Sequence, residues 1–425
     1  MSFLAVLRHL LRGQRFRELF VVRVTSQFGD GVFQIALASY LLFSPEKQAD
    51  AGSIAAALAA VLLPFSVIGP FAGVFLDRHD RRLILARFNI VRAVPTLTAA
   101  AIVAASANAD GAVYVTVIVA FGLNRFLLSG LSASLPRVVD SSDLLMANAV
   151  TPTSGTIAYM CGLAAGAGLR QIPIGFDHNA GVIVVAALLY CAAGLLALRI
   201  PPRQLGPDLA EPRPSLLHEL GAVMRGLVAG VRHLRDRPQA GYALGAIGVH
   251  RFWYGLISVA TILLYRNTFE PGDSDAAFAA LSVAVLGAGI GYFTAAIVTP
   301  LATSRLTPRA WILVLLGLAA AVTVFPTALY TEPAIIVGAL FLGLAAQGMK
   351  ICVDTLVQRH VDDAFRGRVF SIYDVLFNVA FVLAAIVAAA VVPTSGKSYW
   401  LLAATAAGYL TTAAAYARLT HKAAP

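Results

Sequence analysis

Charged and amide side chains recur at helical spacing inside apolar stretches of this sequence. The first stripe places four side chains 4, 3 and 4 residues apart, on one face of a helix: Arg23, Gln27, Asp30 and Gln34. Two further stripes comprise Gln347, Lys350, Asp354 and Gln358, and His250, Tyr254, Ser258 and Thr261. Because a charge in apolar surroundings has to be paired or used, these stripes mark the residues best placed to do chemistry.

Asp30 is the first candidate for carrying a proton. Burial favours the neutral form of a carboxyl group and a neighbouring guanidinium favours the charged form, so a balance between them permits proton uptake and release. We expect Arg125 to be its partner, and Asp374 to be a second candidate for proton coupling. The alternative for Asp30 is a static buried ion pair. Arg92 is expected to be structural, and Arg23 to reach toward the inner surface.

Other polar residues of these stretches are candidates for lining a substrate cavity. They are Gln27, Gln34, His250, Arg251, Trp253, Tyr254, Gln347, Lys350, Asp354 and Asn378. Purely structural roles are possible for several of them. Lys350 and Asp354 can neutralise each other as an i, i+4 pair. His250, Trp253 and Tyr254 can equally serve helix packing. Cations in these stretches outnumber anions by five to three, which favours a neutral or anionic substrate.

The elements that must position these residues are membrane-spanning helices. The chain is 59% hydrophobic and 13% charged, with a mean hydropathy of +0.78, and a soluble domain has about twice that charged fraction. Apolar runs of about 20 residues, enough to cross a bilayer, recur along it. We expect twelve spans at Arg17–Phe43, Ala51–Leu76, Leu83–Ser106, Gly111–Ala133, Ala147–Gly168, Asn179–Arg199, Pro238–Tyr265, Asp275–Thr299, Ala310–Leu329, Pro333–Asp354, Val369–Val392 and Ser398–Arg418. The expected fold class is an all-α membrane protein.

The basic residues predict the orientation of these spans. If both termini are cytoplasmic, the inner loops, tails and inner span ends hold 23 of the 32 Lys and Arg residues, and the outer loops hold four. A cytoplasmic excess of this kind is a topology signal, so the net charge of +10 does not indicate nucleic-acid binding. The many Arg and Ala residues favour a bacterial plasma membrane.

Two halves of six spans flank a break in the apolar pattern. Residues 201–237 begin Pro-rich and then become amphipathic, which predicts a helix lying on the inner surface. The halves match at an offset of 222 residues, where Leu41–Phe43 faces Leu263–Tyr265 and Arg137–Asp140 faces Arg359–Asp362. The expected organisation is a cytoplasmic interfacial segment at 1–16 before an uncleaved first helix, bundles at 17–200 and 238–418, a cytoplasmic linker at 201–237 and a cytoplasmic tail at 419–425.

The turn between the second and third spans carries a cluster of glycine and charged residues. In order, they are Gly73, Asp77, Arg78, Asp80, Arg81 and Arg82. Gly73 would permit close approach of two helices, and Asp77 could cap a helix or pair with a guanidinium. A positive-inside topology explains the arginines but not the acid four residues after a glycine. The turn resembles the signature G-x-x-x-D-R-x-G-R-R of the major facilitator superfamily, with Asp80 at the usual second glycine.

This resemblance implies the major facilitator fold, with two pseudo-symmetric six-helix bundles whose spans 1, 4, 7 and 10 line a central cavity. It also implies a cytoplasmic gate, formed by Gly73, Asp77, Arg78, Arg81 and Arg82. The segment Gln27–Gly31 and the turn Arg366–Arg368 resemble the drug- and macrolide-efflux branch, to which siderophore exporters are close.

Two features depart from the family pattern. Gly130 follows Arg125 one residue later than in the family's R-x-x-x-G segment. The fifth span has Gly162, Gly166 and Gly168, which suit close packing, but it lacks the Gly-Pro pair of antiporters, so antiport is not implied.

Together these features predict a secondary active transporter, coupled to protons, that exports small amphiphilic molecules by alternating access. An exporter of siderophore-like or lipid anions, an importer, and a non-transporting membrane sensor of the same fold remain alternatives. The sequence has no nucleotide-binding loop, metal-ligand spacing or nucleophile motif, so we expect neither an enzyme nor a cofactor or metal. The expected partners are a small-molecule substrate, a proton gradient and the lipid bilayer, and the protein is expected to act as a monomer.

Overall fold

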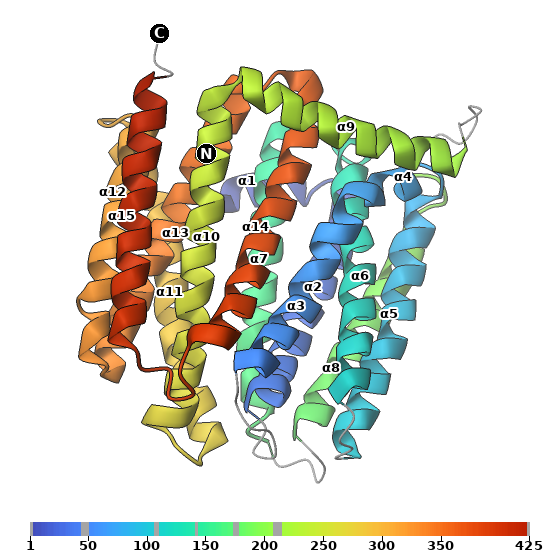
Figure 1. Cartoon of the computed structure of the whole chain (residues 1–425). Coiled ribbons are helices and arrows are strands. Elements are labelled where there is room, and N and C mark those ends of the chain that lie inside the picture. The colour runs from blue at the N-terminus through green and yellow to red at the C-terminus, as the bar shows by residue number, and fades with distance from the viewer. Residues whose placement is uncertain are drawn as a thin grey trace. The chain divides into compact units, whose positions relative to one another are not determined.

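The structure is a computed structural model that describes residues 3–43, 51–105, 110–140, 143–172, 178–206 and 215–422. All regular elements in these ranges are helices (Figure 1). The helices that coincide with the twelve expected spans are α2 (Gln14–Phe43), α3 (Ala51–Ile68) continued by η1 (Gly69–Phe71) and α4 (Ala72–Leu76), α5 (Arg81–Ala104), α6 (Asp110–Ser134), α7 (Leu144–Leu169), α8 (His178–Leu198), α10 (Pro238–Leu264), α11 (Ser274–Thr303), α12 (Pro308–Val324), α13 (Glu332–His360), α14 (Asp363–Val391) and α15 (Tyr399–Lys422). The remaining elements are α1 (Phe3–Leu10), η2 (Leu135–Arg137), α9 (Leu216–Asp236), the π-helical turn η3 (Tyr265–Phe269) and η4 (Thr327–Leu329).

Length and composition suit most of these helices to a bilayer. Within the described ranges, nine are long and apolar enough to cross a membrane. The other three expected spans, α2, α7 and α15, are helices of 30, 26 and 24 residues. Large apolar side chains also remain exposed along the helices, for example on one face of α11: Leu286, Ile290, Phe293 and Ile297. Such stripes are rare on soluble monomers and fit contact with lipid tails.

Capping side chains begin several helices where the sequence supplies them. Asp80 precedes α5, and its Oδ1 accepts a hydrogen bond from the backbone N–H of Arg82 at 2.9 Å. Asp273 caps α11 in the same way, and Thr307 caps α12. These oxygens satisfy N–H groups that the first turn of a helix leaves unpaired. The replacement of the family's glycine by Asp80 therefore gives α5 a defined start.

Packing divides the chain into two compact units. Unit 1 comprises Met1–Leu41 and Leu63–Val223, and unit 2 comprises Leu42–Leu62 and Met224–Pro425. In unit 1, α5 packs against α6 and α8, and α1 packs against α7. In unit 2, the main pairs are α11 with α13, α10 with α14, and α12 with α15. The start of α3 belongs to unit 2, where its side chains share a core cluster with those of α10 and α14.

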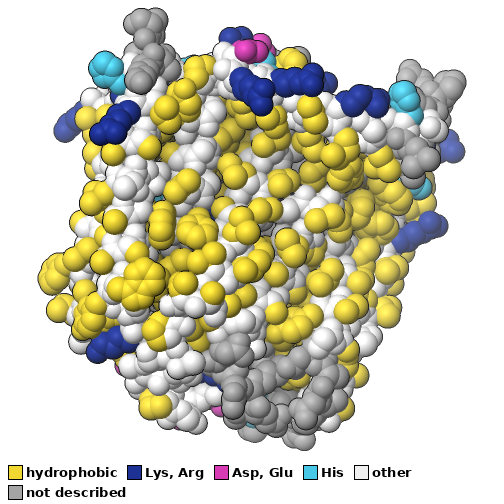
Figure 2. Space-filling model, viewed as in Figure 1, with side chains coloured by type: hydrophobic (Ala, Val, Ile, Leu, Met, Phe, Trp, Pro, Cys, Tyr) yellow, Lys and Arg dark blue, Asp and Glu magenta, His cyan; other side chains and the backbone are white. Residues whose placement is uncertain are grey.

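The linker contains the expected amphipathic helix. α9 begins in unit 1 and ends in unit 2 as one continuous helix of 21 residues. Its Arg225, Arg232 and Arg235 are exposed. Figure 2 shows hydrophobic side chains spread along the spans on the visible face, whereas Lys and Arg side chains gather along α9. This distribution agrees with a helix at the surface of the membrane.

Candidate functional site

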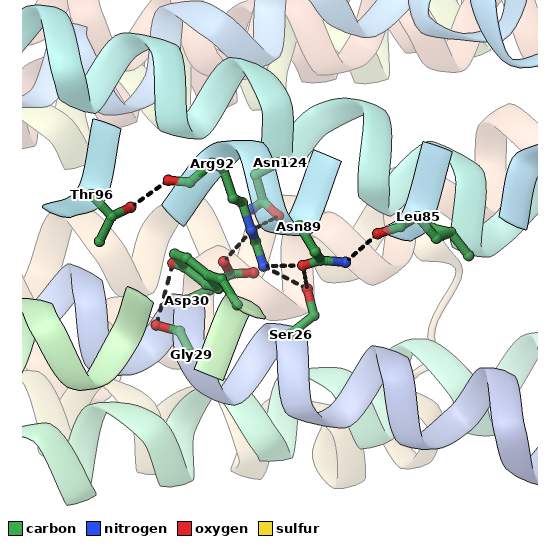
Figure 3. A network of polar contacts seen from close by, with 9 residues as sticks. Ser26, Gly29, Asp30, Leu85, Asn89, Arg92, Thr96 and Asn124 are labelled. Carbon is green, nitrogen blue, oxygen red and sulfur yellow. Dashed lines mark hydrogen bonds and ion pairs between the residues drawn. The ribbon is translucent and has the colours of Figure 1, made fainter. Parts of the chain in front are cut away.

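A buried polar network in unit 1 joins three helices around one guanidinium (Figure 3). Nη1 of Arg92 on α5 donates to Oδ1 of Asp30 on α2 at 2.8 Å and to Oδ1 of Asn124 on α6 at 2.7 Å. Its Nη2 donates to Oγ of Ser26 at 2.6 Å and to Oδ1 of Asn89 at 2.9 Å. The five side chains belong to residues that are at most 6% exposed. The network thus holds a charge pair out of reach of bulk water.

The guanidinium of Arg92 is held by more than its ion pair. Three neutral oxygens accept hydrogen bonds from it besides Asp30, and its centre lies 3.6 Å above the ring of Tyr190. Buried ion pairs are stable only where further hydrogen bonds satisfy both groups. Protonation of Asp30 would remove its charge but leave a carboxyl oxygen that can accept, so Arg92 would keep its acceptors and its place.

The partner of Asp30 differs from the sequence expectation. Arg92, expected to be structural, makes the ion pair at 2.8 Å, and Arg125, the expected partner, does not. The guanidinium of Arg125 lies instead beside Gly69, where an added Cβ would come within 2.9 Å of its Nε. The residue before it, Asn124, is the one that enters the network. The sequence did contain a sign of the role of Arg92, because Asn89 and Arg92 are two polar residues three positions apart in an apolar span.

A cavity of about 200 Å³ opens beside the network in unit 1. Its lining residues are Gln27, Asp30, Gln34, Phe121, Asn124, Leu128, Thr156 and Tyr159. Two of the expected lining residues, Gln27 and Gln34, are therefore present together with Asp30. The Tyr159 hydroxyl donates to Oε1 of Gln34 at 2.6 Å. Arg23 is buried rather than extended toward the surface, and its Nε donates to Oε1 of Gln27 at 3.0 Å.

Two glycines bring α2 and α7 into backbone contact next to this cavity. A Cβ at Gly31 would collide with the carbonyl oxygen of Tyr159, and a Cβ at Gly162 would collide with that of Phe28. The expectation of close packing at the fifth span is confirmed at Gly162. It is wrong at Gly168, where an added Cβ meets nothing within 4 Å.

The candidate residues of α13 and α14 in unit 2 form local contacts. Lys350 Nζ lies 2.7 Å from Oδ2 of Asp354, which confirms the i, i+4 pair, and the two side chains are 41% and 28% exposed. Gln347, one turn earlier on α13, is partly buried. On α14, Asp374 is exposed, and Nδ2 of Asn378 donates to its backbone carbonyl at 3.0 Å.

The candidate residues of α10 lie among aromatic rings of unit 2. Arg251 is stacked against two rings of α14, with its guanidinium centre 4.3 Å from the centroids of both Phe377 and Phe381. His250 is 2% exposed, and neither ring nitrogen has a hydrogen-bond partner among the described residues. The Trp253 ring packs against Gly408 of α15, where a Cβ would collide with it.

The expected gate residues join the turn before α5 to neighbouring segments of unit 1. Nη2 of Arg81 donates to Oδ1 of Asp77 at 2.9 Å, and Nη2 of Arg82 donates to the carbonyl oxygen of Leu198 at 2.7 Å. Nε of Arg78 lies 2.9 Å from Oε2 of Glu219 on α9. Asp77 thus pairs with a guanidinium and leaves helix capping to Asp80.

The expectation that Gly73 permits close approach of two helices is wrong for the described residues. An added Cβ at Gly73 meets nothing within 4 Å, so no close helix approach depends on it.

Comparison with known proteins identifies the family. The sequence pattern of the Major Facilitator Superfamily matches residues 19–385. The chain belongs to this superfamily. An uncharacterised MFS-type transporter of Mycobacterium tuberculosis is 37% identical over 388 residues, which cover 90% of this chain and 86% of that protein. An uncharacterised MFS-type transporter of Sinorhizobium fredii is 25% identical over 350 residues, with 81% of each chain covered.

Solved structures share the major facilitator fold. The nucleoside transporter NupG has a TM-score of 0.70 at 15% identity and covers 96% of this chain and 99% of its own. The human organic anion transporter MFSD10 has a TM-score of 0.60 at 15% identity and covers 95% of this chain and 98% of its own. Its membership of the superfamily and its 37% identity to an MFS-type transporter make this protein a multi-pass membrane transporter and not an enzyme. No cluster of three or more His, Cys, Asp or Glu side chains that could hold a metal occurs in the described ranges.

Proposed function

We propose that this major facilitator is a proton-coupled exporter of small amphiphilic molecules, with Asp30 as the proton carrier. The observation that carries the proposal is the position of Asp30, which lines the cavity on one side and pairs with Arg92 on the other. A proton carrier must change charge without unfolding its surroundings. The three neutral acceptors of Arg92 supply that condition.

Alternating access links this site to a gradient. Protonation of Asp30 replaces a buried charge pair by a cation whose hydrogen-bond acceptors are all neutral, so the two protonation states differ in the charge that faces the cavity. A transporter that favours different conformations in these two states couples proton movement to substrate movement. Asp374, exposed on α14, is a second acid that can take part.

Direction and location follow from the sequence patterns. The segment Gln27–Gly31, which contains Asp30, resembles the drug- and macrolide-efflux branch, and this supports export. The distribution of Lys and Arg supports a plasma-membrane protein with both termini in the cytoplasm, which puts the turn at Asp77–Arg82 on the cytoplasmic side as a gate. The protein is proposed to work as a monomer.

The experiment separates proton coupling from stability. An untargeted comparison of the culture medium of cells with and without the protein first supplies a transported compound. Proteoliposomes then measure the accumulation of this compound under an imposed pH gradient, and its exchange without one, for the wild type, D30N and D30N/R92Q. D143N is the matched control, because Asp143 is an acid of the same unit that pairs with His9 outside the network.

We expect both Asp30 variants to lose gradient-driven accumulation. The double variant keeps exchange and a wild-type unfolding temperature, because it leaves no unpaired charge. D143N transports as the wild type. Gradient-driven accumulation at the wild-type level by D30N/R92Q would overturn the role of Asp30.

A further inference from the structure

Arg251 is a cation without an anion in the middle of a membrane span. It is the fourteenth of the 27 residues of α10, and no hydrogen bond or ion pair engages its guanidinium among the described residues. Asp354 on α13 pairs with Lys350 at 2.7 Å instead. A charge at this depth is costly and is usually functional, so the missing partner calls for a ligand.

Aromatic rings fix the orientation of this guanidinium. Phe377 and Phe381, one turn apart on α14, each lie 4.3 Å from its centre, and Tyr254 lies 5.5 Å from it. Stacking on a ring uses the face of the guanidinium and leaves the N–H groups at its edge available. The rings therefore hold a planar fork of donors in place, which is the geometry that binds a carboxylate through two parallel hydrogen bonds.

Arg251 points away from the exposed apolar face of its helix. Val249 is 44% exposed, and Arg251 follows it by two residues, which is about 200° around a helix. The Arg251 residue is partly exposed, but its Nε atom is buried without a partner. Part of the Arg251 residue can therefore be reached from outside, while its Nε lies in a dry environment, where a charge interacts strongly with a ligand.

Further unsatisfied polar groups lie next to Arg251. His250 and Tyr409 are 2% and 0% exposed, and their rings are 5.4 Å apart. The two ring nitrogens of His250 and the hydroxyl of Tyr409 have no hydrogen-bond partner in the part of unit 2 that the structure describes. Buried polar atoms of native proteins are normally satisfied, so these unpaired atoms, two of them on the residue that precedes Arg251, indicate a missing polar group.

We propose that Arg251 binds the carboxylate of an organic anion whose apolar body packs on the rings of Phe377, Phe381 and Tyr254. This inference names organic anions as the substrate class of the proposed exporter, and it rests on that proposed function. The binding itself needs no gradient, so it can be tested apart from proton coupling.

The test compares an acid with its neutral isostere. The purified full-length protein in detergent is titrated with 2-naphthoate and with 2-naphthamide, which differ only in the charged group. Binding constants and thermal unfolding are measured for the wild type, R251Q, R251K and R309Q. Arg309 is the matched control, because this arginine of unit 2 donates to the backbone carbonyl of Ala417.

We expect the wild type and R309Q to bind 2-naphthoate at least about tenfold more tightly than 2-naphthamide, since hydrogen bonds to charged groups contribute more than neutral ones. R251Q loses this preference, and its unfolding temperature without ligand stays at or above that of the wild type. R251K retains part of the preference, because it keeps the charge but not the planar fork. If R251Q does not fold, the test is decided by whether R251K has a smaller preference for 2-naphthoate than the wild type.

Two results would overturn the assignment of Arg251. One is a wild type without preference for the carboxylate, and the other is a preference that survives in R251Q or is undiminished in R251K. D30N/R92Q is titrated in the same way, and its preference for the carboxylate should equal that of the wild type. A carboxylate preference without gradient-driven transport would therefore count against proton coupling alone.

Discussion

Both units of this transporter stack a guanidinium on aromatic rings inside a span, yet the two cations have opposite surroundings. Arg92 in unit 1 lies 3.6 Å above Tyr190 and has an acid and three neutral oxygens as acceptors. Arg251 in unit 2 lies 4.3 Å from two phenylalanine rings and has neither an acid nor a hydrogen bond among the described residues. The first cation is satisfied by groups of the protein, whereas the second contacts only aromatic rings in the part of the chain that the structure describes.

The difference is informative because the halves are similar in organisation. The offset of 222 residues that relates them sets Phe252 opposite Asp30, so Arg251 lies one residue from the position that corresponds to the acid. Two matching spans therefore carry charges of opposite sign at similar depth. We infer a division of labour in which unit 1 handles the proton and unit 2 handles an anionic group.

The largest effect is expected where the cation is paired. R92L removes the guanidinium that donates to the buried Asp30 and Asn124 and leaves Oδ1 of Asn89 only the hydrogen bond from Ser26, so the free energy of unfolding should fall by about 3–5 kcal/mol. R251L should stay within about 1 kcal/mol of the wild type, because the lost stacking of about 0.5–2 kcal/mol is offset by removal of an unpaired charge. Denaturant unfolding of both purified variants without ligand measures the contrast. Equal losses would show that the two cations have the same role.

A smaller effect is expected at the wall of the unit 1 cavity. G162V drives a side chain into the carbonyl oxygen of Phe28, so α2 and α7 must separate, at a cost of about 1–3 kcal/mol. G168V is the control on the same helix, since its added atoms meet nothing within 4 Å, and it should change stability by less than about 0.5 kcal/mol. Unfolding in the same detergent compares them. Indistinguishable variants would mean that the contact at Gly162 adds nothing.

The smallest effect is expected at the ion pair that unit 2 does possess. Lys350 and Asp354 are 41% and 28% exposed, so this pair is much less buried than that of Arg92, and K350M should cost no more than about 1 kcal/mol. High salt should reduce the difference further. Unfolding at two salt concentrations tests this. A loss comparable to that of R92L would place Lys350 in a network as tight as that of unit 1.

Most of the fold could be predicted from the sequence because bilayer length and apolar composition act locally. The twelve helices fall where apolar runs of span length occur, and α9 falls where the pattern becomes amphipathic. Local chemistry also explains a departure from the family signature, because Asp80 caps α5 where a glycine is usual.

The pairing inside the site could not be predicted, since it depends on the rotation of one helix against another. Asn124 and Arg125 are neighbours in sequence, but their side chains point about 100° apart on α6. A shift of one residue along α6 therefore decides whether an amide or a guanidinium enters the network. Spacing places Asp30 on the correct face of its own helix, whereas nothing local tells whether α5 or α6 supplies the guanidinium.

The contact between Gly31 and the carbonyl of Tyr159, with its counterpart at Gly162, has a consequence for selectivity. Backbones in direct contact cannot come closer, and glycines have no side chain that could change its rotamer. The distance between α2 and α7 beside the cavity is therefore fixed. The volume of this cavity is about 200 Å³. This cavity of unit 1 would then select its occupant by size, and part of a larger molecule would have to lie outside it.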